Sequence, residues 1–333
     1  MRYLVTGAAG FIGSAVSREL ANAGHAVYGV DDLSDYYSPH LKEMRLLHFN
    51  SEKKWEFIPG NIGDNNFLNS IMEKINPEII IHLAAQAGVR IPNSSWHRYT
   101  QNNLSAFSNL ILKSAEMGIK DFVYASSSSV YGDSASVPFS ESELKLEPTS
   151  YYGATKLSNE ILAKSLSKRT GIKTRGLRFF TVYGPWGRPD MAYFRIIGNV
   201  ETGIPFNLLG DGTVRRDFTF IDDAVEAVVA LAAELQSKRP TFNDVVNIGG
   251  GSPVSIREII KLISEISGKS VEYSSIAADS QDMTLTIADF SYLESLTGKK
   301  PLTPIKVGLR NTIAWSGDQK VQSNLDAWIK SVL

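Results

Sequence analysis

A tyrosine and a lysine four residues apart form the pair in this sequence that is best suited to proton chemistry. In Tyr152-Gly-Ala-Thr-Lys156 the spacing puts both side chains on one face of a helix, so the ammonium can lie close to the phenol. A nearby cation favours phenolate and lowers the tyrosine pKa toward neutrality, as a general base requires. An exposed tyrosine with an unrelated lysine is also common at this spacing, so the interpretation depends on what precedes the helix.

Four consecutive serines precede it, at positions 126–129, directly after an apolar run, Phe122–Ala125, that is typical of a buried strand. Ligands of open α/β sheets bind at the carboxyl ends of the strands, so these hydroxyls would face the same substrate oxygen as Tyr152. Ser127 can share the proton that Tyr152 removes, and the next two serines can bind a polar group such as a carboxylate. The alternative is a serine loop that caps itself through local backbone bonds.

A glycine triplet near the N-terminus predicts a dinucleotide site. Gly7, Gly10 and Gly13 lie between an apolar strand, Tyr3–Thr6, and a helix that begins near Phe11. Glycine permits a tight turn and a close approach of the backbone to a pyrophosphate, and the helix N-terminus supplies N–H donors. Such a triplet can also serve packing alone, but its position between strand and helix favours the binding interpretation.

The ends of the next three predicted strands complete this cofactor site. Asp31 ends the second strand, where a carboxylate can accept both ribose hydroxyls and would repel a 2′-phosphate, so NAD is predicted rather than NADP. Asn61 and Ile62 follow the third strand and could meet adenine. Small residues, Ala84–Ala85, follow the fourth and let the cofactor pass close to the sheet. Arg90 could bind phosphate or be a plain surface arginine.

The elements that must position these residues alternate along the first half of the chain. Short β-branched runs followed by longer amphipathic stretches predict the α/β class, with a Rossmann-like doubly wound parallel sheet. The expected strands are Tyr3–Thr6, Val27–Val30, Trp55–Ile58, Ile79–His82, Phe122–Ala125, Thr174–Arg178 and Val245–Ile248. After Phe180 the alternation gives way to loops rich in Gly, Pro and aromatic residues, which predicts a smaller α/β substrate-binding domain. The expected division is 1–180, with 221–249 returning to it, against 181–220 and 250–333.

Composition restricts the class of partner. The 333 residues carry 34 basic and 35 acidic side chains without blocks, which gives no footprint for nucleic acid or a membrane surface. There is no cysteine, and the five histidines lack metal-ligand spacing, so we expect no metal site. The opening MRYLVTGAAGFIG enters a strand at its second residue, which predicts a cytoplasmic protein without a secretory leader.

Together these motifs resemble the extended short-chain dehydrogenase/reductases of the NAD-dependent epimerase/dehydratase family, and among them the UDP-glucuronate 4-epimerases. The resemblance covers nearly the whole chain and rests on TGAAGFIG, Asp31, SSSSVYG, Tyr152-x-x-x-Lys156 and FFTVYGPWGRPDMAYF. It implies a tightly held NAD, Tyr152 as base, Lys156 on the nicotinamide ribose, Ser127 as hydroxyl partner and Asn103 ordering the site. It also implies a UDP-sugar substrate and a homodimer formed by the helices near 100–118 and 152–168.

The sequence departs from the family pattern at two positions. Asn61 stands where the family usually has Asp, which loosens the adenine assignment, and Asp32 stands where Asn is usual, which leaves the NAD preference intact or strengthens it. Related dehydratases resemble one another in an Asp–Glu pair beside the hydroxyl, and decarboxylases carry a Glu there. This chain has Ser128 and Ser129 instead.

Epimerisation is therefore the reaction we expect, between UDP-glucuronate and UDP-galacturonate through a 4-keto intermediate, with NAD⁺ regenerated in each cycle. The alternatives are a 4-epimerase of neutral UDP-hexoses or UDP-N-acetylhexosamines, and, from another class, a non-catalytic NAD-binding sensor. A uronate ketone is a β-keto acid, so its carboxylate has to be held by fixed donors. Ser128, Ser129 and Arg195 are the favoured candidates, with Arg188 as a less favoured one.

The predicted catalytic residues are Tyr152, Lys156 and Ser127. The predicted cofactor residues are Gly7, Gly10, Phe11, Ile12, Gly13, Asp31, Asn61, Ile62, Ala84, Ala85, Asn103, Tyr152 and Lys156. The predicted substrate residues are Arg90, Ser127, Ser128, Ser129, Thr181, Arg188, Arg195, Asn207, Arg216 and Asp282; of these, the resemblance assigns Thr181, Asn207 and Arg216 to the UDP portion.

Overall fold

A parallel sheet forms the centre of the molecule in this computed structural model, which describes residues 1–333 except 49–53, 90, 134, 278–282 and 333. Within the described residues its seven strands run in the order β10-β6-β5-β4-β1-β2-β3. Their bounds are β1 (Arg2–Thr6), β2 (Ala26–Asp31), β3 (Trp55–Pro59), β4 (Ile79–His82), β5 (Asp121–Ser127), β6 (Lys173–Phe179) and β10 (Asn243–Ile248). Every neighbouring pair is parallel. The strand order reverses between β1 and β4, which is where open α/β sheets bind their ligands.

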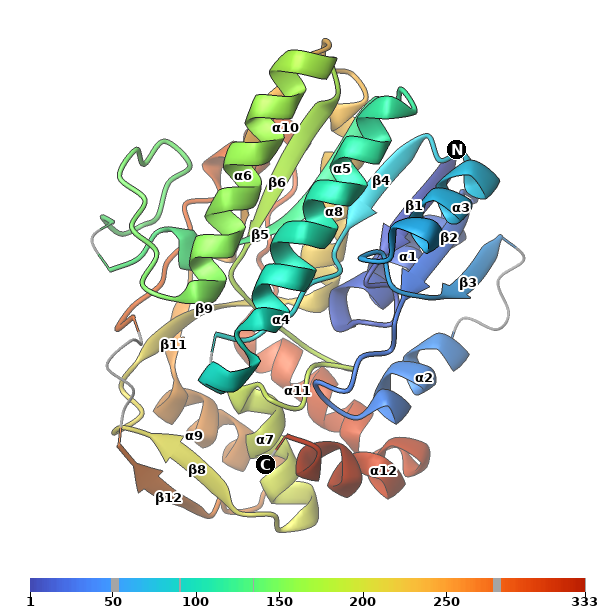
Figure 1. Ribbon diagram of the computed structural model, residues 1–333. Coiled ribbons are helices and arrows are strands. Elements are labelled where there is room, and N and C mark those ends of the chain that lie inside the picture. The colour runs from blue at the N-terminus through green and yellow to red at the C-terminus, as the bar shows by residue number, and fades with distance from the viewer. Residues whose placement is uncertain (49–53, 90, 134, 278–282, 333) are drawn as a thin grey trace.

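Helices cover both faces of this sheet (Figure 1). One face carries α1 (Phe11–Asn22) and α8 (Ile221–Leu235), and the other carries α3 (Asn65–Ile75), α5 (Ala106–Glu116) and α6 (Tyr151–Thr170). Successive strand residues point to opposite faces. Val5 and Ile81 accordingly pack in the core beneath α1 and α8, whereas Leu4 and Ile80 pack beneath α3 and α5. The expected doubly wound α/β fold is confirmed.

A second, smaller group of elements lies below the carboxyl edge of the sheet in Figure 1. In the described part of the chain it holds a three-stranded sheet, β11-β9-β7, and a two-stranded one, β12-β8. Their strands are β7 (Thr181–Tyr183), β8 (Phe206–Leu209), β9 (Arg215–Phe220), β11 (Pro253–Ser255) and β12 (Tyr273–Ile276). The helices are α7 (Ala192–Thr202), α9 (Ile256–Ser267), α11 (Ile305–Ser316) and α12 (Gln319–Lys330). The expected smaller α/β unit has few local signals: the hydrophobic periodicity predicts one of these helices, over Ile256–Ile266, and α9 agrees with it.

Among the described residues, three shorter α-helices remain: α2 (Pro39–Leu47), α4 (His97–Tyr99) and α10 (Ser291–Thr297). Helix α4 continues into a π-helical segment, Thr100–Ser105, ahead of α5. Irregular segments of this kind often lie at functional sites, because they re-aim one side chain within a helix.

Candidate active site

A cavity of about 1010 Å³ runs along the carboxyl edge of the parallel sheet and is lined by both groups of elements. It collects the predicted site residues with three exceptions. Arg90 and Asp282 lie outside the described residues, and Asn103 lies behind the cavity wall. The predicted residues that line it are Gly7, Gly10, Phe11, Ile12, Gly13, Asp31, Asn61, Ile62, Ala84, Ala85, Ser127, Ser128, Ser129, Tyr152, Lys156, Thr181, Arg188, Arg195, Asn207 and Arg216.

The glycine turn brings three backbone segments closer together than side chains would allow. Gly7 has a φ of +72°, and a Cβ there would lie 2.6 Å from the backbone nitrogen of Ala84. A Cβ on Gly13 would lie 2.0 Å from the backbone oxygen of Gly7. Gly10 caps α1, and no side chain bonds the free N–H groups at this end. The turn therefore leaves an open, positively polarised helix end that fits a pyrophosphate.

Asp31 is held rigidly at the end of β2. One carboxylate oxygen accepts a hydrogen bond from the backbone N–H of Ala9 (3.1 Å), and the other accepts one from Leu33 (2.8 Å). The sequence analysis missed the third neighbour, Lys42 of α2, whose buried Nζ lies 3.7 Å from Asp31 Oδ1. Each carboxylate oxygen keeps acceptor capacity for a ribose hydroxyl, since a carboxylate has about four lone-pair sites.

The two departures from the family pattern are partners in one hydrogen bond. Asn61 Nδ2 donates to Asp32 Oδ2 at 3.1 Å, and Asn61 Oδ1 accepts from the backbone N–H of Gly63 at 2.7 Å. The bond thus joins the loops after β2 and β3, with the amide on the β3 side and the carboxylate on the β2 side. This arrangement places a second negative charge beside Asp31 and none on the β3 side of the pair.

Tyr152 and Lys156 share one face of α6, as their spacing predicts. Ser150 caps the helix by accepting a hydrogen bond from the N–H of Gly153 at 3.0 Å, which fixes where α6 begins. The Lys156 side chain is buried, and its Nζ lies 5.7 Å from the centre of the Tyr152 ring. The same Nζ donates to the backbone oxygen of Ala125 at 2.9 Å, so β5 holds the ammonium in place.

The expected electrostatics of this pair are wrong for the protein by itself. Burial raises the pKa of Tyr152 above its usual value, while the Arg188 cation and a hydrogen bond with Ser127 lower it in part. Burial also lowers the pKa of Lys156 to about 8. Desolvation is therefore the largest effect on the Tyr152 pKa, and the cation that lowers it is Arg188, from the loop after β7.

The four serines form local hydrogen bonds and also line the cavity. The Ser126 hydroxyl donates to Glu160 Oε1 at 2.5 Å, and Glu160 forms a buried, two-bond ion pair with Arg178. Ser127 Oγ accepts from the N–H of Ser129 at 3.1 Å and donates to its hydroxyl at 3.2 Å. Ser127 therefore caps a short 3₁₀ turn, Ser128–Val130, as the alternative interpretation held, and all four serines line the cavity.

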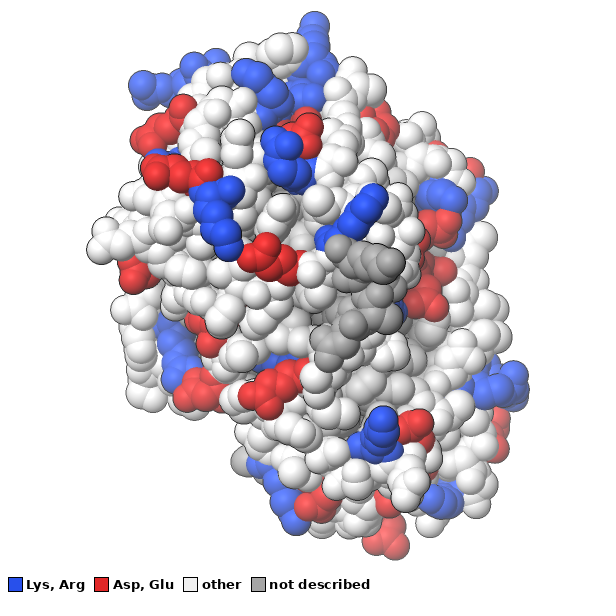
Figure 2. Space-filling model, turned by 90° about the vertical axis from the view of Figure 1, so that its right-hand side faces the viewer, with Lys and Arg blue, Asp and Glu red and all other residues white. Residues whose placement is uncertain are grey.

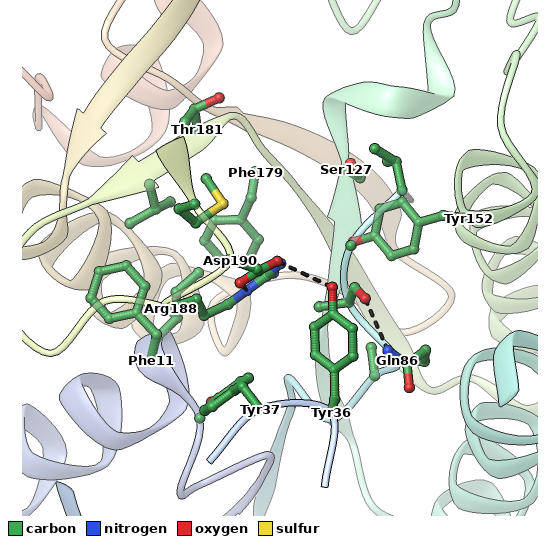
Figure 3. A pocket seen from close by; sticks show the side chains of 18 of the residues that line it. Phe11, Tyr36, Tyr37, Gln86, Ser127, Tyr152, Phe179, Thr181, Arg188 and Asp190 are labelled. Carbon is green, nitrogen blue, oxygen red and sulfur yellow. Dashed lines mark hydrogen bonds and ion pairs between the residues drawn. The ribbon is translucent and has the colours of Figure 1, made fainter. Parts of the chain in front are cut away.

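Arg188 lies in a network that the sequence analysis did not foresee. Its Nε and Nη2 bind the two carboxylate oxygens of Asp190 at 3.0 and 2.5 Å, and the Tyr36 hydroxyl donates to Asp190 Oδ2 at 3.1 Å. Figure 3 shows the Tyr36 phenol pointing at this pair, with Tyr152 on the opposite side of the cavity. The fragments DYYS and GRPDM carry these residues, but they are far apart in sequence and no local pattern links them.

The remaining substrate candidates belong to the second group of elements. Arg195 of α7 lies over the Phe206 ring at 5.8 Å, and burial lowers its pKa. Arg216 of β9 donates to the backbone oxygen of Met283 at 2.6 Å. Thr181 starts β7, and Asn207, on β8, is exposed to the cavity.

Asn103 is buried next to the cavity but does not line it. Its Oδ1 accepts from the N–H of Gln86 at 2.8 Å, and its Nδ2 donates to the backbone oxygen of Gln86 and to Thr155 Oγ1, both at 3.2 Å. These bonds tie the loop after β4 to α6. An ordering role for Asn103 agrees with this geometry, and its assignment to the cofactor residues stays a prediction.

The structure offers no counterpart for two other kinds of site in the part of the chain that it describes. No group of three or more His, Cys, Asp and Glu side chains is arranged to hold a metal ion there. None of the helices there combines the length and the apolar character that crossing a bilayer requires.

Comparisons with known proteins agree with a dinucleotide and nucleotide-sugar site in this cavity. The model of the NAD dependent epimerase/dehydratase family matches residues 3–249. The chain is 38% identical over 316 residues to a UDP-glucuronate 4-epimerase of Thermodesulfobacterium geofontis, covering 94% of this chain and 95% of the relative. A probable UDP-glucuronate 4-epimerase of Rhizobium meliloti is 36% identical over 330 residues, with 95% and 96% covered.

Among solved structures, the UDP-glucuronic acid 4-epimerase of Bacillus cereus in complex with UDP-glucuronic acid and NAD is similar, with a TM-score of 0.87 and 35% identity. The match covers 95% of this chain and 98% of that one. The family match spans well over half of the chain, and the relatives match nearly all of it. The chain therefore belongs to the NAD-dependent epimerase/dehydratase family, within the short-chain dehydrogenase/reductases.

Proposed function

We propose that this protein is a UDP-glucuronate 4-epimerase that interconverts UDP-glucuronate and UDP-galacturonate. A relative that matches over nearly its whole length carries that name, and the similar Bacillus cereus enzyme was solved in complex with UDP-glucuronic acid and NAD. One observation carries the proposal: Tyr152 and the Arg188 cation face each other in a cavity that is continuous with the glycine turn. A base, a cation that can bind the sugar carboxylate and a turn that can bind the dinucleotide then line the same cavity.

Tyr152 is the base in this proposal, and it takes the proton of the C4 hydroxyl. Ser127 shares that proton through its hydrogen bond with the phenol, and Lys156, anchored on Ala125, holds the nicotinamide ribose. Bound NAD⁺ supplies the hydride acceptor and later the hydride donor. Since burial raises the pKa of Tyr152, the base depends on nearby positive charge, which Arg188 provides.

The glycine turn and the ends of β2 to β4 form the cofactor half. Asp31 can accept the ribose hydroxyls, and the adjacent Asp32 adds to the repulsion of a 2′-phosphate, so NAD is the cofactor. The open N-terminus of α1 suits the pyrophosphate. Residues 1–180 with 221–249 would form this NAD-binding domain, and 181–220 with 250–333 the nucleotide-sugar domain.

The carboxylate partner is Arg188 rather than Arg195. Arg188 is the cation that acts on Tyr152, so it lies near the reacting sugar, whereas Arg195 lies on α7 beside Phe206. Ser128 and Ser129 line the same cavity and can add hydroxyl donors. Holding the carboxylate in the ring plane keeps the C5–carboxylate bond out of line with the C4 carbonyl, which prevents loss of CO₂. Arg195 then joins Thr181, Asn207 and Arg216 at the UDP end.

Two further features of the proposal concern the whole protein. A homodimer through α5 and α6 is supported by the exposed apolar side chains of Leu112, Ile161 and Leu162 on these adjacent helices. A cytoplasmic location stays a prediction from the sequence.

The function is tested by incubating the purified protein with UDP-glucuronate, without added NAD, and following the sugar protons by NMR. We expect the signals of UDP-galacturonate to appear, since the cofactor is retained and regenerated. Tyr152→Phe, which keeps the ring and removes the hydroxyl, should lower kcat by at least about 10²-fold.

Other outcomes of this assay distinguish the alternatives. Faster turnover of UDP-glucose or UDP-N-acetylglucosamine than of UDP-glucuronate would favour an epimerase of neutral sugars. Net build-up of NADH or CO₂ would favour a dehydrogenase or decarboxylase. Cofactor binding without turnover of any nucleotide sugar would favour a sensor.

A further inference from the structure

The Arg188 side chain is held from one side by residues of both groups of elements. Asp190 is two residues further along the same loop, while Tyr36 comes from the loop after β2, in the half that we assign to the cofactor. Gly88 makes room for Tyr36: a Cβ at Gly88 would lie 2.2 Å from the Tyr36 hydroxyl oxygen. The arrangement therefore depends on three loops, those after β2, β4 and β7.

Asp190 occupies one defined edge of the guanidinium. It takes the Nε and Nη2 hydrogens, which form one of the two forks that arginine offers to a carboxylate. Within the described residues, Nη1 makes no hydrogen bond with the protein. The fork that contains Nη1 is thus left for a ligand in the cavity. Both side chains are about a fifth exposed, at 21% for Arg188 and 19% for Asp190, so the pair borders the cavity rather than bulk solvent.

Asp190 also neutralises Arg188. Burial alone would raise the pKa of Asp190, but Arg188 and the Tyr36 hydrogen bond hold it below its usual value, so the carboxylate stays ionised. Its charge reduces the positive potential that Arg188 projects onto Tyr152.

We propose that Asp190, held by Tyr36, is a positioning residue that decides which edge of the Arg188 guanidinium faces the sugar carboxylate and how much of its charge reaches Tyr152. This inference rests on the proposed function, in which Arg188 binds the uronate. Asp190 and Tyr36 need not touch the reacting atoms themselves. They act through Arg188, and the two effects, on orientation and on charge, can be measured separately.

The charge effect predicts a shifted pH profile. The groups that face Tyr152 are Lys156 from its own helix, Ser127 from β5, Tyr99 from α4, whose ring centre is 6.1 Å away, and Arg188 from the loop after β7. Asp190→Asn removes the counter-charge of Arg188 and leaves the other groups in place. An added net positive charge favours phenolate, so the acid limb of kcat/KM for UDP-glucuronate should move to lower pH by about one unit.

A matched control is Asp35→Asn. Asp35 is on the same loop as Tyr36, its side chain is 77% exposed, and it pairs with Arg98 instead of Arg188. We expect the acid limb of kcat/KM in Asp35→Asn to lie at the same pH as in the unsubstituted protein. General loosening of the site by Asp190→Asn would lower the rate at every pH without moving the limb.

The orientation effect is tested with Tyr36→Phe, which removes one hydroxyl and no charge. We expect the calorimetric Kd for UDP-glucuronate to rise about three- to ten-fold, as for the loss of one hydrogen bond, with the Kd for UDP unchanged. Tyr28→Phe, on β2, is the control for a lost phenol hydroxyl.

Tyr36→Phe should also release more CO₂ per turnover. In that side reaction the C5–carboxylate bond breaks, its electron pair forms the enolate of the C4 ketone, and a proton then adds at C5. The UDP-4-ketopentose leaves with the cofactor still reduced. The double variant of Tyr36→Phe and Asp190→Asn should have the same acid limb and the same Kd for UDP-glucuronate as Asp190→Asn alone, because Tyr36 acts through Asp190.

The outcomes separate this inference from the proposed function. If the unsubstituted protein binds UDP-glucuronate no better than UDP-glucose, the proposed function fails. If it prefers the uronate and epimerises it, but Asp190→Asn leaves the acid limb in place or Tyr36→Phe leaves affinity and CO₂ release unchanged, the positioning role is overturned. If Asp190→Asn does not fold, the Kd and the CO₂ release of Tyr36→Phe test the positioning role.

Discussion

At the scale of single residues, Lys156, one of the proposed catalytic residues, lowers the stability of the fold. Its ammonium is buried, and among the described residues no carboxylate pairs with it. Burial lowers its pKa to about 8, from 10.5 for a free lysine, which means that the folded protein binds this proton less tightly than the unfolded chain does. Below pH 8 both states are protonated and the folded state carries the full penalty.

Lys156→Met should therefore stabilise the cofactor-free protein while abolishing activity. A shift of this size corresponds to about 3 kcal/mol, reduced by the hydrogen bond that Ala125 loses. The penalty fades between pH 8 and 10.5, because the lysine then deprotonates in the folded state before it does so in the unfolded one. Urea unfolding at pH 7 and pH 9.5 measures the difference. A variant less stable at pH 7, or a gap that does not narrow at pH 9.5, would contradict the assignment.

At the scale of elements, α2 joins the two loops that carry the cofactor turn and Arg188. The buried guanidinium of Arg45 donates to the backbone oxygens of Ala9 (3.1 Å), Trp186 (2.9 Å) and Gly187 (2.9 Å). It also donates to the Tyr37 hydroxyl at 2.6 Å. A planar fork with five N–H donors can reach these oxygens together, whereas a single ammonium cannot.

Arg45→Lys should consequently be a damaging substitution. We expect a loss of about 2–3 kcal/mol in the free energy of unfolding, as for charged hydrogen bonds that are broken, and weaker retention of NAD. Urea unfolding and the absorbance of NAD that stays with the protein through gel filtration measure the two effects. Arg169→Lys, at the exposed end of α6, is the matched control. Equal stability and cofactor content in both variants would show that α2 does not hold these loops.

At the scale of the whole molecule, two adjacent helices expose apolar side chains on a surface of mixed charge. Acidic and basic side chains are interspersed over the face in Figure 2, and neither sign covers it. Helices α5 and α6 pack side by side on one face of the sheet (Figure 1) and expose Leu112 (43%), Ile161 (62%) and Leu162 (37%). Apolar residues exposed on two adjacent helices are typical of an interface between subunits.

Ile161→Glu should convert the proposed dimer into a monomer, because a charge at the centre of an apolar interface is costly to bury. Light scattering after gel filtration gives the mass directly. Leu144→Glu is the control, since Leu144 is 97% exposed in the loop before α6 and lies on neither helix. A dimer that persists in the Ile161 variant, or a monomer without any substitution, would place the interface elsewhere or remove it.

The sequence by itself determined the strands of the parallel sheet and the edge of that sheet at which the site residues lie. Strand and helix periodicity, the Gly7–Gly13 turn and the Tyr152–Lys156 spacing are local patterns, so each could be interpreted from a few neighbouring residues. The expected strands are all present with their ends within two residues, and nearly all the predicted site residues that the structure describes line one cavity.

Only the tertiary structure decided how these side chains are paired and how they ionise. Tyr36 meets Asp190 across 154 positions of sequence, and Lys42 reaches Asp31 from another element. The pKa of Tyr152 rises rather than falls, because burial of the phenol outweighs the effect of the Arg188 cation. Burial and long-range contact exist only after the chain has folded. No spacing in the sequence encodes them.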